Sequence, residues 1–178
     1  ARLASPGVLK YAKMCHILDN RAIIGTLGFH LGFNLQQKSV LQGYNQEVED
    51  ELLKRIAWQE QGYKLFEISV FAGSSKCGWF NGPAESNALF MASSLWKELG
   101  GYDERFLAKG GGLVNLDVYN RALQLPNATS YILLGEATFH QVHGGISTNQ
   151  NREDATFKVF NEEYKQIHGK YFKRVEQE

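Results

Sequence analysis

An uncharged run of eight residues, AIIGTLGF from Ala22 to Phe29, constrains the fold more than any other segment. It is apolar and rich in β-branched residues, which predicts a buried strand with two permissive glycines. Amphipathic helical patterns flank it at 5–18 and 45–58. Strands that alternate with helices indicate an α/β layered domain, and 178 residues are enough for one such core.

The rest of the chain continues this alternation. Ser5 is the expected cap of the first helix, with Pro6 at its first position. Glycine-rich or polar loops are expected at 32–43, 73–82 and 109–112. Strands are expected at 63–72, 85–91, 131–134 and 137–140, and helices at 93–99, 113–125 and 152–168.

Charge and cysteine content exclude several classes of protein. The chain carries 19 Lys and Arg against 19 Asp and Glu, which argues against a basic nucleic-acid footprint. No apolar run reaches the roughly 18 residues that a transmembrane helix needs. Cys15 and Cys77 lack the spacing of a zinc site or a redox motif. We expect free thiols in a reducing compartment, the cytoplasm.

The common phosphate-binding and hydrolase motifs are absent. The sequence has no P-loop, no dinucleotide-binding glycine motif and no G-x-S-x-G nucleophile elbow. Gly110, Gly111 and Gly112 precede a helix and could cradle a phosphate at its N-terminus. A flexible loop is the simpler interpretation of the three glycines, and both interpretations stay open.

His140 and His143 end the last predicted strand and are candidate metal ligands. Positions three apart on a strand point to opposite faces, so only one of the two is expected to face a given site. A single histidine at a strand end can complete a metal shell whose other ligands lie elsewhere. The alternative is a pair of ordinary surface histidines.

Further polar and aromatic residues have both a chemical and a structural interpretation. Asp117 opens a helix, where an acid caps the helix or acts as a general base toward a hydroxyl. Glu85 and Asn87 precede an apolar strand and either bind a ligand or satisfy a turn. Trp79 and Phe80 in a glycine loop either stack on a sugar or fill the core.

Three ordered segments between residues 85 and 143 resemble the inverting family-two glycosyltransferases of the GT-A fold. Residues 85–106 (ESNALFMASSLWKELGGYDERF) resemble the strand and helix that lead to that family's "LGGYDERF". Residues 111–122 (GGLVNLDVYNRA) resemble its "GGEDxDLxxRA", and 132–143 its terminal strand with a metal-binding histidine. Residues 1–9 (ARLASPGVL) resemble the segment that follows the family's Asp-x-Asp motif. The resemblance implies a mixed sheet flanked by helices.

The resemblance also implies transfer of a sugar from a nucleotide-sugar donor to an acceptor hydroxyl. A divalent cation, Mn²⁺ or Mg²⁺, would neutralise the diphosphate leaving group. Asp117 matches the second acid of the "EDxD" block, and Asn115 falls where the catalytic base is usual. The polypeptide N-acetylgalactosaminyltransferases have a similar segment with Asn, and an H-x-x-H whose second histidine binds the metal, which favours His143 over His140. Glu85, Asn87, Trp79 and Phe80 would then face the acceptor.

The family's uridine-binding strands and its Asp-x-Asp motif would precede Ala1. We therefore expect residues 1–178 to be the acceptor-side portion of one GT-A domain, inactive without the donor-binding part. An amide at Asn115 cannot take a proton, which keeps open a non-catalytic carbohydrate-binding or interaction module of the same fold. A metal-dependent hydrolase that uses the two histidines is a third reading. The sequence leaves the sugar, the acceptor and the oligomeric state open.

Overall fold

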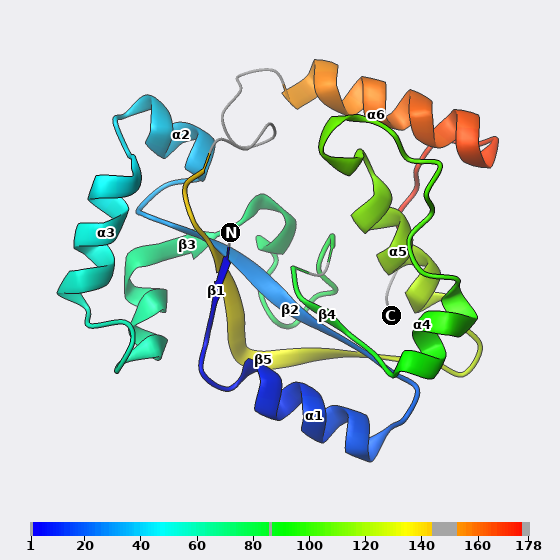
Figure 1. The fold of residues 1–178 in the computed structure, drawn as a ribbon, viewed down its shortest axis with the longest axis horizontal. Coiled ribbons are helices and arrows are strands. Elements are labelled where there is room, and N and C mark those ends of the chain that lie inside the picture. Colours follow the sequence, from blue (N-terminus) through cyan, green and yellow to red (C-terminus); the bar gives the residue numbers. More distant parts are fainter. Residues whose placement is uncertain (1, 86, 144–152, 176–178) are drawn as a thin grey trace.

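The structure, a computed structural model, describes residues 2–85, 87–143 and 153–175. Within them, the strands form one mixed sheet flanked by helices, as the sequence predicts (Figure 1). The strand order is β1–β5–β2–β3, and β4 also pairs with β2. The strands are β1 (Arg2–Ala4), β2 (Ala22–Leu31), β3 (Ser69–Phe71), β4 (Leu89–Phe90) and β5 (Thr129–His140).

The helices lie in the order that the hydrophobic periodicity predicts, with one addition at α2. Short 3₁₀ helices at Gly62–Ile68, Gly73–Ser75 and Lys109–Gly111 connect the larger elements. The α-helices are α1 (Val8–Leu18), α2 (Gln36–Leu41), α3 (Gln46–Arg55), α4 (Ser93–Leu99), α5 (Val114–Leu123) and α6 (Glu153–His168). The predicted start of α6 at Arg152 lies outside the described residues.

Strand β2 is the centre of the sheet. It pairs in parallel with β5 along one edge and antiparallel with β3 and β4 along the other. The parallel register runs to Gly25 opposite Ile132 and resumes at Leu27 opposite Ala137. Gly135, with φ of 73°, lies in this break, so the two strands predicted at 131–140 are one bulged strand.

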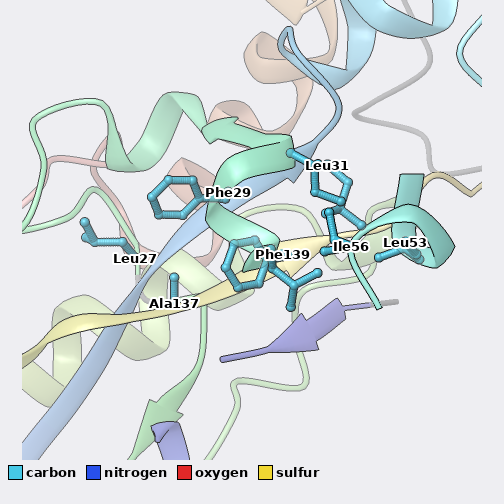
Figure 2. Packing of buried hydrophobic residues seen from close by; sticks show 9 residues of the cluster. Leu27, Phe29, Leu31, Leu53, Ile56, Ala137 and Phe139 are labelled. Atoms are coloured by element: carbon cyan, nitrogen blue, oxygen red, sulfur yellow. The ribbon is translucent and has the colours of Figure 1, made fainter. Parts of the chain in front are cut away.

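The largest apolar cluster lies where β2, β5 and α3 meet (Figure 2). Phe29 and Phe139 face each other across the paired strands, with ring centroids 5.6 Å apart. Leu53 of α3 and Ile56, the residue that follows α3, cover them. The cluster therefore fixes the orientation of both central strands.

Two further clusters attach helices to the first half of β2. Ile24 packs against α1 through Ala12, whereas Ile23 packs against Leu95 of α4 and Tyr119 of α5. Successive residues of a strand point to opposite faces, so α1 and the α4–α5 pair cover opposite faces of the sheet. This double cover explains why the run at 22–29 carries no charge.

Three local predictions were wrong. Residues 63–72 form a 3₁₀ helix and only a short strand, because Leu65 and Ile68, three residues apart, are the buried positions. The loop predicted at 32–43 contains α2. Ser5 does not cap α1, whose N-cap is Gly7; the Ser5 side chain is buried and donates to the carboxylate of Glu136 instead.

Among the described residues, no helix combines the length and apolar character needed to cross a membrane. Cys15 and Cys77 are both unpaired thiols, as expected from their spacing.

Candidate functional site

Two histidines end the two central parallel strands side by side. His30 of β2 pairs in register with His140 of β5, and their ring centroids lie 5.7 Å apart. Their neighbours Phe29 and Phe139 point into the core, so both histidines point to the other face of the sheet. Strand β1 adds Arg2 opposite His140. This corner of the sheet therefore gathers polar side chains from three strands.

Gln36, a buried residue at the start of α2, fixes the protonation of both rings. Its backbone N–H donates to Nδ1 of His30 at 2.9 Å. Its side-chain Nε2 donates to the Gln141 carbonyl at 3.4 Å, which turns its Oε1 toward Nδ1 of His140. Because Oε1 only accepts, Nδ1 of His140 carries the proton and its Nε2 is unprotonated.

His143 brings its own Nε2 to 3.0 Å from Nε2 of His140. The expectation that only one of the two histidines can face a site was wrong. Strand β5 ends at His140, so strand alternation does not govern the ring of His143. The buried carboxylate of Glu49 accepts the backbone N–H of Val142 at 2.9 Å and holds the chain in this turn. The structure thus places both predicted metal ligands together.

Burial favours the uncharged form of His140 and His30. Burial, together with the positive charge of Arg2 and the neighbouring imidazoles, lowers the pKa of His140 to about 3. Burial and Arg2 likewise lower the pKa of His30 to about 4. A neutral imidazole is the form that binds a metal. His30 accepts at Nδ1, so its Nε2 carries a proton and serves as a donor.

At 3.0 Å the two Nε2 atoms lie within hydrogen-bond distance of each other, and this separation also fits two adjacent ligands of one cation. Two nitrogens at about 2.1 Å from a shared ion, at a right angle, are about 3.0 Å apart. Among the described residues, however, no group of three or more His, Cys, Asp or Glu side chains could hold a metal ion. A cation here would take His140 and His143 as two ligands and need its remaining ligands from another source.

Glu85 and Asn87 lie beside this corner, as a ligand-binding role requires. The negative charge of Glu85 acts on Arg2, the residue that also acts on both histidines. The Asn87 amide lies directly over Gly28, where a Cβ atom would come within 2.4 Å of its Cγ. Nδ2 of Asn87 is buried and has no hydrogen-bond partner among the described residues. Such a donor is normally satisfied by water or a ligand.

The two aromatic residues Trp79 and Phe80 lie in different environments. Trp79 is half-buried, packs against Phe29 and Phe66 and donates its Nε1 hydrogen to the Glu136 carbonyl at 3.4 Å. It therefore fills the edge of the core. Phe80 is 89% exposed and is free to contact a ligand.

Gly110, Gly111 and Gly112 all adopt positive φ, which only glycine adopts readily. The backbone N–H groups of Leu107 and Ala108, just before them, donate to Glu163 of α6 at 2.8 and 2.7 Å. A Cβ atom at Gly112 would lie 2.6 Å from the other Glu163 oxygen. The loop is thus held by a carboxylate of the same chain.

Asp117 and Asn115 of α5 lie in different environments. Asn115 is exposed. Asp117 is 1% exposed and accepts from Arg121 at 2.7 Å, with Nε2 of His168 at 3.4 Å. Arg121 also donates to the carbonyls of Leu99 and Gly101 after α4. This geometry favours a structural role for Asp117, and its catalytic role stays a prediction.

Four residues around these sites were not predicted from the sequence: Arg2, His30, Gln36 and Arg121. A histidine directly after the apolar run was a usable signal for His30. The spacing of four between Asp117 and Arg121 on a helix was a signal for their ion pair. Arg2 and Gln36 gave no signal, because only the folded sheet brings them to the histidines.

Comparisons with protein-family models, with curated proteins and with solved structures find no match for this chain. The mixed α/β architecture and the paired histidines are therefore what the structure contributes, and the glycosyltransferase resemblance rests on the sequence motifs.

Proposed function

We propose that the chain is part of a glycosyltransferase that moves a sugar from a nucleotide-sugar donor to an acceptor hydroxyl with the help of a divalent cation. The observation that carries the proposal is the His140–His143 pair, with its two Nε2 atoms 3.0 Å apart. The order of the motifs at 85–106, 111–122 and 132–143 supports the same reading.

In this proposal His140 and His143 hold the cation, and Gln36 keeps His140 in the tautomer that can do so. Bound there, Mn²⁺ or Mg²⁺ would offset the charge of the diphosphate leaving group. Arg2 faces the same space and adds a fixed positive charge for that diphosphate. The diphosphate of the nucleotide-sugar donor would supply further ligands of the cation.

The acceptor would lie against Glu85 and Asn87. The unpartnered Nδ2 of Asn87 is suited to orient a sugar hydroxyl, and Glu85 to accept a proton from one. Phe80, which is exposed, offers a stacking surface. Asn115 cannot act as a base, so this proposal assigns that step to Glu85.

The second candidate is a carbohydrate-binding module that lacks catalysis. It is favoured by the amide at Asn115 and by the engagement of Asp117 with Arg121. The two candidates differ in whether sugar binding needs the cation.

Binding of UDP- and GDP-sugars to the full-length protein, measured by isothermal titration calorimetry with and without Mn²⁺, separates them. We expect affinity only with Mn²⁺, and its loss in His143→Ala. His16→Ala is the matched control, because His16 is an exposed histidine on α1. Binding that is indifferent to Mn²⁺ and to His143→Ala would favour the binding module. Transfer activity that survives Glu85→Gln would remove Glu85 as the base.

A further inference from the structure

A pocket lies away from His140 and His143, between α5, the end of α6 and the segment 169–175. Its volume is about 560 Å³, within the range of small-molecule sites. Arg121 and His168 line it, together with Lys170, Lys173 and Arg174. Nothing in the proposed transfer reaction uses these residues.

The pocket concentrates positive charge in a chain whose net charge is zero. Among the described residues that line it, Asp117 is the one acid, and Arg121 neutralises it. Lys170, Lys173 and Arg174 form no ion pair with any residue of the described ranges 2–85, 87–143 and 153–175. Three cations in one concave surface raise the local concentration of anions.

The wall that carries these cations is fixed in place. The buried side chain of Asn120 donates to the Lys173 carbonyl at 2.8 Å and accepts the Val175 N–H at 3.3 Å. The Phe172 N–H donates to Oδ1 of Asn161 on α6 at 2.9 Å. Lys173 and Arg174 are therefore held over α5, which reduces the entropy lost on binding.

We propose that this pocket binds a phosphorylated small molecule. A phosphate or diphosphate group carries two or more charges, which matches the lysine–arginine excess, and Arg174 can bind two oxygens of such a group at once. The pocket volume accommodates a sugar or nucleoside attached to it. A nucleic acid would instead need a basic surface that extends along its backbone. The proposal is independent of the glycosyltransferase function.

Inorganic pyrophosphate is the probe, titrated calorimetrically into the 178-residue chain. We expect saturable one-to-one binding that weakens about tenfold or more in the variant Lys173→Gln, Arg174→Gln. Binding should also weaken between about 0.01 M and about 0.1 M salt, where the screening length falls from ~30 Å to ~10 Å. The charge-matched control is Lys10→Gln, Lys13→Gln on α1, across the molecule from α6 (Figure 1), with an expected change below about twofold.

Circular dichroism checks that both variants keep the fold. Equal weakening in the two double variants would overturn the proposal, since it would indicate a non-specific charge effect. Absence of saturable binding would also overturn it. Glu176 and Glu178 follow the basic segment in the sequence and could offset its charge, so a third variant is Glu176→Gln, Glu178→Gln. Binding that appears only in this variant would mean that the natural sequence does not form the site.

Discussion

Replacing Arg121 tests the structural role of the buried carboxylate at the heart of α5. In Arg121→Met, Asp117 stays buried, and its remaining side-chain contacts among the described residues include the His168 ring at 3.4 Å and a hydrogen bond to Tyr164. The carbonyls of Leu99 and Gly101 lose their donor as well. Removing one partner of a buried ion pair costs about 3–5 kcal/mol.

The lower end of that range applies, because the Arg121 side chain is 29% exposed and water relieves part of the loss. We therefore expect the free energy of unfolding to fall by about 3 kcal/mol. Urea unfolding followed by circular dichroism measures this loss. With free energy falling by about 2 kcal/mol per M urea, the midpoint of the unfolding transition should fall by about 1.5 M. The double variant Asp117→Asn, Arg121→Met should lose less than the sum of the single changes, with a coupling of about 2 kcal/mol. A loss below about 1 kcal/mol, or no coupling, would refute the structural role.

Two further predictions concern the loops around α6. Glu163→Ala should lower the free energy of unfolding by about 2 kcal/mol, because the N–H groups of Leu107 and Ala108 lose a charged acceptor. Hydrogen exchange should accelerate at those two amides, and unchanged exchange would contradict this. The hydrogen bond from Arg105 lowers the pKa of Asp103 to about 2, so ionised Asp103 stabilises the fold above its ordinary pKa near 4, and this stability is lost as the pH falls through about 2. After a discount for solvent screening, Asp103→Asn should lower the free energy of unfolding by about 1 kcal/mol at about pH 5 and by nearly nothing at about pH 2. An equal loss at both pH values would contradict the stabilising role of ionised Asp103.

The parts of the fold that could be predicted follow from local signals. The run at 22–29 is buried on both faces, so its composition alone indicates a strand. Asn45 accepts the Val48 N–H, and Gly100 ends α4 with φ of 79°, so the ends of these helices agree with their capping residues. The segment 63–72 could not be read in this way, because its alternation and its spacing of three both fit the same apolar residues.

The candidate site was predictable as a pair of residues but not as an arrangement. The spacing of His140 and His143 suggested opposed side chains, and only the end of β5 allows their rings to meet. The tautomer that leaves Nε2 of His140 unprotonated depends on Gln36, 104 residues away along the chain. Interactions that depend on such distant contacts have no local sequence pattern.

The central claim is that His140 and His143 share one divalent cation. The most direct measurement is the anomalous scattering of Mn²⁺ in crystals of the chain grown or soaked with the metal. The account predicts a peak within about 2.2 Å of Nε2 of both histidines, absent in His143→Ala. A crystal structure at saturating Mn²⁺ in which the two rings stay hydrogen-bonded to each other at 3.0 Å, with no peak between them, would contradict it.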